Sequence, residues 1–179
     1  MFPIIPADTA SASFPENEEG IIAYGYISGY VSMSNKVSDA GVVATDVSGV
    51  GSVRSHSGGC EYGDDKGIFG YGVNVSPGKI SVTNLVSNTG VIATDTTGVG
   101  TARSALAGCS YDEDKGIFGY GHVAGSVSMS NLVSNTGVVA TDTTGVGTAR
   151  DEIAATEYGG DKGIFGFGIA GGAGKSAVT

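Results

Sequence analysis

Alternation of bulky and small residues is the main pattern along the chain. In "KGIFGYG" (115–121) the bulky residues are separated by glycine, and "SVSMSNLVS" (126–134) alternates strictly. The runs "ALAGCSY" (105–111) and "GVVATD" (137–142) are compact and apolar or β-branched. A period of two is typical of β-strands, and no segment shows the 3.6-residue period of a helix. We therefore expect four antiparallel strands here and, by the same criterion, under about 5% helix in the whole chain.

The pattern recurs at a nearly fixed distance. "DKGIFGYG" stands at 65–72 and 114–121, "DKGIFGFG" at 161–168, and a degenerate "GIIAYG" begins at Gly20. Three sets of residues recur with spacings of 49 and then 47: Asp46, Asp95 and Asp142; Arg54, Arg103 and Arg150; Phe69, Phe118 and Phe165. Self-similarity at such a period marks a repeat architecture. The predicted units are about 8–54, 55–103, 104–150 and an incomplete 151–179, which makes about three and a half units after an N-terminal arm, 1–7.

Four-stranded units of this length are typical of propeller blades, whereas β-solenoids usually use shorter coils, so the propeller is favoured over the solenoid. In each blade the octapeptide supplies the second strand. Ile117 and Phe118 are expected to point to opposite faces and to pack against different neighbouring blades. The glycines allow positive φ in the next turn and close approach of the sheets.

An open array of blades exposes strand edges, which aggregate, so closure is expected. The arm segment "FPII" (2–5) can supply a closing strand. Within one chain this makes a four-bladed ring, and between two chains a ring of about seven or eight blades. We favour the two-chain ring.

Composition narrows the class of partner. The formal net charge is −9 and the pI is about 4.4, which argues against nucleic acid and against anionic membrane surfaces. The N-terminus lacks a basic segment followed by an apolar one, and no apolar run approaches the length of a membrane span. We expect neither a signal peptide nor a membrane partner.

The acidic turns and the glycine-rich loops have plain structural interpretations. The turns "YGDDKG", "YDEDKG" and "YGGDKG" are interpreted as capping turns, in which Asp114 bonds nearby backbone amides; Ca²⁺ binding is the alternative, but the usual ligand alternation is absent. "GVGTAR" lacks the Lys-Ser/Thr of a phosphate-binding loop. Its arginine is expected to pair with a carboxylate or carbonyls at each blade junction, with ligand contact at the rim as the alternative.

The remaining reactive residues carry no catalytic pattern. His56 and His122 occupy non-equivalent positions and have no ligand partner at metal spacing. Cys60 and Cys109 are equivalent, and Ser13 and Thr156 stand at the matching positions, so the site requires a small side chain. We expect buried free thiols, no metal, no cofactor and no enzymatic activity.

The order of these runs resembles a kelch-type repeat: a small apolar strand, an acidic turn, "DKGIFGYG", an alternating strand, a compact strand and then arginine. In that family the second strand ends in a glycine doublet, which here is split as Gly119, Tyr120 and Gly121. The family's tryptophan in the fourth strand is absent, and Val139 or Ala140 lies near that place. The resemblance covers about 8–179 and implies kelch-like blades.

The phrase "NLVSNTGVVATDTTGVGTAR", together with "YGGDKGIFGFG", is also similar to repeat arrays in tail-fibre-like and other structural proteins of tailed bacteriophages. That resemblance implies a non-enzymatic structural or attachment protein located in the virion. Its expected partners are further copies of itself, other virion proteins or a host surface receptor. The alternative is a host-encoded propeller module that binds carbohydrate or protein, either in the cytoplasm or at the cell surface by a non-classical route.

Overall fold

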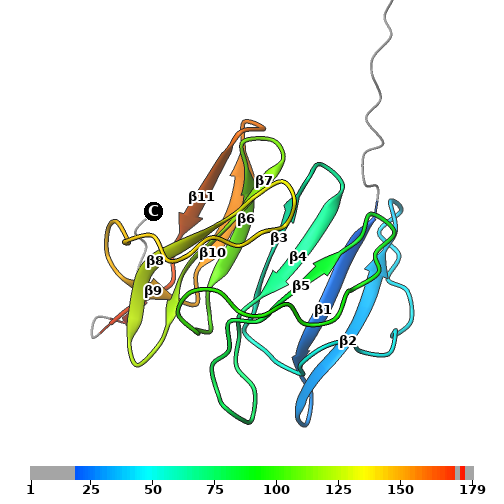
Figure 1. Ribbon diagram of the computed structural model, residues 1–179, viewed down its shortest axis with the longest axis horizontal. Helices are drawn as coiled ribbons and strands as arrows, with labels where there is room; N and C mark the ends of the chain where they lie inside the picture. The colour runs from blue at the N-terminus through cyan, green and yellow to red at the C-terminus, as the bar shows by residue number, and fades with distance from the viewer. Residues whose placement is uncertain (1–18, 172–173, 176–179) are drawn as a thin grey trace, which may run out of the picture.

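All regular structure in the described part of the chain is β (Figure 1). The computed structural model describes residues 19–171 and the backbone of 174–175. No helix occurs in these ranges, which confirms the expected all-β class. The strands are β1 (Gly20–Tyr26), β2 (Tyr30–Val37), β3 (Gly58–Tyr62), β4 (Lys66–Gly70), β5 (Thr83–Val86), β6 (Ala107–Tyr111), β7 (Lys115–His122), β8 (Ser126–Val133), β9 (Arg150–Asp151), β10 (Ala154–Tyr158), β11 (Lys162–Gly166), β12 (Ile169–Ala170) and β13 (Gly174–Lys175).

The strands form small antiparallel sheets that follow the sequence repeat. We name the described parts of the repeats unit 1 (19–54), unit 2 (55–103), unit 3 (104–150) and unit 4 (151–171). Their sheets are β1-β2, β3-β4-β5, β6-β7-β8 and β10-β11, and the short β9, β12 and β13 continue the sheet of unit 3. The expected arm, its closing strand at 2–5 and the first strand of unit 1 lie outside the described residues.

The predicted fourth strand of a unit is only partly formed. Its residues make isolated bridges to the third strand, at Val133↔Val139 and Ser130↔Thr143 in unit 3. Between these bridges the Nδ2 of Asn131 donates to the carbonyl of Ala140 at 3.0 Å. A side chain therefore takes the place of part of the backbone ladder, which the alternation of residue types did not reveal.

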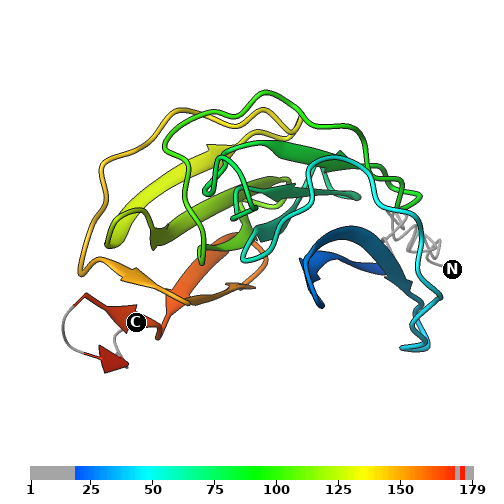
Figure 2. The ribbon, with the colours of Figure 1, turned by 90° about the horizontal axis from the view of Figure 1, so that it is seen from below.

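The units stand side by side in chain order (Figure 1) and follow an arc, with unit 1 at one end and unit 4 at the other (Figure 2). Neighbouring units touch through their first strands, β3 against β6 and β6 against β10. The described residues form no closed ring. The architecture shown is thus an open, curved stack of small sheets.

The hydrophobic core lies between the sheets of successive units. Between units 2 and 3 it contains Ile68, Tyr71, Leu106, Phe118 and Val133, all buried. Phe118 reaches from β7 onto the sheet of unit 2, and its ring lies edge-on to that of Tyr71 at a centroid distance of 5.5 Å.

One glycine in each of units 2 and 3 is required because the neighbouring unit comes so close. A Cβ on Gly70 would lie 3.1 Å from the ring of Phe118, and a Cβ on Gly119 would lie 2.8 Å from the ring of Phe165. Phe118 and Phe165 therefore each need a residue without a side chain in the unit before them. The sequence predicted this close approach of sheets.

The Gly-Tyr-Gly segment forms a bulge that the sequence did not predict. In β7 the pairing with β8 shifts register between Gly119 and Gly121, and Tyr120 between them has a φ of 61°. Positive φ is uncommon for a bulky residue. The tyrosines of the other units and Phe167 share it: Tyr24 at 66°, Tyr71 at 62° and Phe167 at 62°. Bulges re-aim side chains, and here each tyrosine ring lies beneath an arginine.

Candidate functional site: the junction between units

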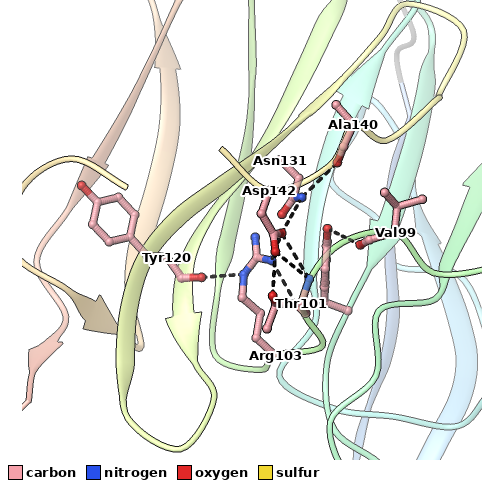
Figure 3. A network of polar contacts seen from close by, with 8 residues as sticks. Val99, Thr101, Arg103, Tyr120, Asn131, Ala140 and Asp142 are labelled. Atoms are coloured by element: carbon pink, nitrogen blue, oxygen red, sulfur yellow. Dashed lines mark hydrogen bonds and ion pairs between the residues drawn. The ribbon is translucent and has the colours of Figure 1, made fainter. Parts of the chain in front are cut away.

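The polar residues that recur in the sequence meet where one unit contacts the next. We call this set the junction. Between units 2 and 3 it consists of Tyr71, Thr101 and Arg103 from unit 2 with Asn131 and Asp142 from unit 3. Figure 3 shows Thr101, Arg103 and Asn131 gathered around the Asp142 carboxylate.

Asp142 joins the two units through charge-assisted hydrogen bonds. It accepts from the backbone N–H of Thr101 at 3.0 Å and from the Thr101 hydroxyl at 2.6 Å. Within its own unit it accepts from the Nδ2 of Asn131 at 2.9 Å. Hydrogen bonds to an ionised acceptor are about twice as strong as neutral ones. The carboxylate therefore holds both a loop of unit 2 and the third strand of unit 3.

Arg103 is fully buried at the same place. Its Nε donates to the carbonyl of Tyr120 at 2.8 Å, its Nη1 donates to the carbonyl of Thr101 at 3.3 Å, and the Asp142 carboxylate lies 3.9 Å away. The guanidinium carbon stands 4.3 Å from the centre of the Tyr71 ring. The planar cation is thus held between a ring, two carbonyls and a carboxylate.

Units 1 and 2 meet in the same way. The hydroxyl of Ser52 donates to Asp95 at 2.5 Å, and Asn84 donates to Asp95 at 2.9 Å. Arg54 stacks on Tyr24 at 3.7 Å, and its Nη2 donates to the Oδ1 of Asn84 at 2.7 Å.

The two junctions differ in this last bond. Within the described part of the chain, Nη2 of Arg103 and Oδ1 of Asn131 are buried without a hydrogen-bond partner. The equivalent atoms of Arg54 and Asn84 are bonded to each other. The Nε atoms differ in the opposite sense: that of Arg103 donates to the carbonyl of Tyr120, whereas that of Arg54 is buried without a partner in the described part of the chain.

The ends of the array hold the remaining members of these sets. Arg150 lies over the ring of Tyr120 at 4.8 Å and donates to the carbonyl of Phe167 at 3.2 Å. Asp46 accepts from the Nδ2 of Asn35 at 2.8 Å, in the manner of Asp95 and Asp142. All nine predicted repeat positions are therefore placed. The arginines, the phenylalanines, Asp95 and Asp142 lie at unit boundaries, with Phe69 edge-on to Tyr24 of unit 1 at 5.6 Å, whereas Asp46 bonds within unit 1.

The electrostatics of the junction follow from its burial and its hydrogen bonds. Burial lowers the pKa of the Arg103 guanidinium and raises the pKa of the Tyr71 hydroxyl. Burial alone would raise the pKa of Asp142, but the hydrogen bonds from Thr101 and Asn131 outweigh it and hold that pKa below its usual range. Asp95 is shifted in the same direction through Ser52 and Asn84. The junction therefore stabilises the ionised form of both aspartates.

The two cysteines lie at the contact between neighbouring units. Both are free thiols, as predicted; Cys109 is buried, but Cys60 is only partly buried. A Cβ on Gly116 would lie 2.6 Å from the Sγ of Cys60, and a Cβ on Gly163 would lie 2.6 Å from the Sγ of Cys109. Burial raises the pKa of Cys60 strongly and that of Cys109 to about 11. Each thiol thus packs on the first glycine of the next unit's octapeptide.

The acidic turns make a side-chain contact in addition to the backbone bond that the sequence predicted. The carboxylate of Asp114 has a side chain as its main partner: it accepts from the Nδ2 of Asn135 at 2.8 Å, and Asp65 accepts from Asn88 at 2.9 Å. Each turn between the first two strands is thereby tied to the turn that follows the third strand. Within the described ranges no three His, Cys, Asp or Glu side chains form a group that could hold a metal ion.

The histidines lie apart. His56 shares a 2.7 Å hydrogen bond with the Ser55 hydroxyl, and His122 ends β7. A hollow of about 530 Å³ lies along the first strands β3, β6 and β10. Residues of all four units line it, among them Glu19, Lys36, Cys60, Phe69, Cys109 and Thr156. In the chain as described there is no helix suited to crossing a membrane.

Sequence reasoning found the arginines, aspartates and phenylalanines but missed their partners. Asn35, Asn84 and Asn131 recur with the same spacings of 49 and 47, as do Ser52, Thr101 and Thr148. The equal spacing of these residues was the signal from which the sequence could have revealed them as junction partners. Comparison of the chain with known protein families and with curated proteins finds no match. The kelch-like and phage-like resemblances therefore remain expectations from the sequence.

Proposed function

We propose that the chain is a non-enzymatic structural protein of a phage virion, a tail-fibre or attachment component built from kelch-like propeller blades. One observation carries this proposal: the recurring charged side chains are used to join one unit to the next. Arg103 is fully buried between units, and Asp142 bonds across the same boundary. A chain that repeats this joint at two successive boundaries is suited to a mechanical or display role.

The propeller geometry is part of the proposal. It is supported by the arc of the units in Figure 2 and by the small antiparallel sheets that touch through their first strands. In blades arranged radially, such first strands lie nearest the axis. The loops at the other end of each sheet would then meet other virion proteins or a host receptor.

The test is the composition of purified particles from the phage whose genome encodes the chain. Mass spectrometry should detect the protein at a fixed ratio to the major structural proteins through successive gradient steps. Its loss during purification, with the known structural proteins retained, would remove the virion proposal. The repeat architecture would be unaffected by that result.

A host-encoded binding module is the second candidate, favoured by the hollow of about 530 Å³ that residues of all four units line. Its wall carries both signs of charge, from Glu61, Glu157, Lys36 and Lys66. Screening the whole chain against glycan and peptide arrays tests this candidate. Binding that is lost in Lys66→Ala but retained in Lys162→Ala, at the equivalent turn of unit 4, would favour it over the virion protein.

A further inference from the structure

The two ends of the array present opposite halves of one interface. At each internal boundary the earlier unit contributes one face and the later unit contributes the other, always with the same repeat positions. We call the first the leading face and the second the trailing face. The leading face of unit 2 carries Ile68 and Tyr71, and the trailing face of unit 3 carries Phe118 and Val139.

The trailing face of unit 1 is exposed at positions that are buried inside the array. Val43 is 56% exposed, whereas its equivalents Ile92 and Val139 are each 8% exposed. Ile22 is 57% exposed, whereas its equivalent Phe118 is 0% exposed. The strand pairing is the same in both units, since Ile22 pairs with Asn35 as Phe118 pairs with Asn131. The described strands of this face, β1 and β2, are thus paired as in unit 3 but uncovered.

The leading face of unit 4 shows the complementary exposure. Ile164 is 42% exposed, whereas its equivalent Ile68 is 1% exposed. Phe167 is 59% exposed, whereas Tyr71 is 0% exposed. Phe167 has the φ of 62° that Tyr71 also has, so its backbone is already in the conformation used at internal boundaries.

We propose that a second copy of this chain covers these faces, with unit 4 of each copy packed on unit 1 of the other. The occupant follows from the internal boundaries, where a leading face of this kind is always met by a trailing face of this kind. Head-to-tail contacts between identical chains either close or grow into filaments. The units follow an arc (Figure 2), so two copies related by a two-fold axis close into a ring with two identical contacts. This assembly holds whether or not the chain belongs to a virion.

One substitution on each exposed face, with a control at the neighbouring Val42, tests the proposal. Val43→Asp places a charge in the contact, and Phe167→Asp does so on the other face. Val42→Asp is the control, because Val42 is 64% exposed and its equivalents Val91 and Val138 are 64% and 65% exposed, so that this position faces solvent in every unit. Far-UV circular dichroism verifies that each variant keeps its fold.

Light scattering coupled to size exclusion, at tens of micromolar, gives the mass of each protein. The native chain and Val42→Asp should have twice the 17.7 kDa chain mass, and Val43→Asp and Phe167→Asp should each be monomeric. A monomeric native chain overturns the proposal. A dimer that survives Phe167→Asp but not Val43→Asp also overturns it, since like faces would then meet. Growth into larger polymers would overturn the proposal that two copies close into a ring.

Discussion

At the scale of single residues, the junction depends on the shape of arginine as well as on its charge. The guanidinium of Arg103 stacks on Tyr71 while two of its nitrogens donate to carbonyls. An ammonium group has no plane to stack and cannot donate in the same fork. The same holds for Arg54 on Tyr24.

Arg103→Lys should therefore destabilise the protein although it keeps the charge. The expected loss in the free energy of unfolding is about 1–3 kcal/mol, the range typical of broken buried networks. Urea unfolding followed by circular dichroism measures it. The control is Lys115→Arg at a half-exposed turn pair, where the change should be within about 0.5 kcal/mol. An equal effect of both substitutions would contradict the stacking role.

The junction aspartates should make stability fall in acid. Because hydrogen bonds lower the folded-state pKa of Asp95 and Asp142, the unfolded chain binds more protons as the pH falls. Their contribution is fully present above the ordinary Asp pKa of about 3.9 and is lost as the pH falls through the lower folded value. Urea midpoints measured between about pH 6 and pH 2 test this dependence.

Asp142→Asn should lower the midpoint at neutral pH and make the acid slope shallower. Asp39→Asn is the control, since Asp39 is exposed and accepts from the adjacent Ala40 amide. An unchanged acid slope in Asp142→Asn would contradict the role given to this carboxylate.

At the scale of elements, each strand is shaped by the neighbouring sheet. Gly116 of β7 has ordinary φ, so its requirement is space: a Cβ would lie 2.6 Å from the Sγ of Cys60 and 2.8 Å from the carbonyl oxygen of Glu61. Gly125, in the turn before β8, also has ordinary φ, and a Cβ there would meet nothing within 4 Å.

Gly116→Ala should therefore destabilise the protein by about 1–3 kcal/mol through overpacking. Gly125→Ala should be neutral or slightly stabilising, because alanine restricts the unfolded chain. The difference in urea midpoint between the two variants is the measurement. Equal midpoints would mean that the sheets have room at Gly116.

The reactivity of the two thiols is a measure of how tightly the strands of neighbouring units pack. Cys60 and Cys109 are free, pack on glycines of the next unit and have raised pKa values. A disulfide reagent at about pH 8 should react with neither in the folded chain and with both in denaturant, since the thiolate is the reactive form. Rapid reaction of the native protein would show that neighbouring units separate readily.

The sequence predicted the strand positions well because alternation and repetition report directly on pleated, two-faced elements. The segment "KGIFG" is indeed in the second strand of each unit from unit 2 onwards. The fourth strand was overpredicted, because Asn131 replaces part of its ladder. Positive φ at Tyr120 was missed, because no local rule places a tyrosine there. The junction was predicted in part. The recurring charged residues Arg103 and Asp142 were identified from the sequence, whereas the neutral Asn131 and Thr101 were missed.

At the scale of the whole molecule, the array behaves as a one-dimensional stack in which each unit touches its neighbours. Junctions of equivalent residues recur between units 1 and 2 and between units 2 and 3. In such stacks the stability is close to a sum of unit and interface contributions. Removing one whole period should then leave a working junction behind.

Deletion of residues 55–103 tests that additivity. It brings Ser52, Arg54 and Tyr24 of unit 1 against Asp142 and Phe118 of unit 3, the same residue types that meet in the native junctions. We expect a cooperatively folded β protein with a lower thermal midpoint, since one unit and one interface are gone. The control removes residues 55–79, which leaves half a unit and an unpaired strand edge, and it should aggregate. If the whole-period deletion also aggregates or unfolds, unit 2 contributes contacts that its neighbours cannot make with each other, and the stack is not additive.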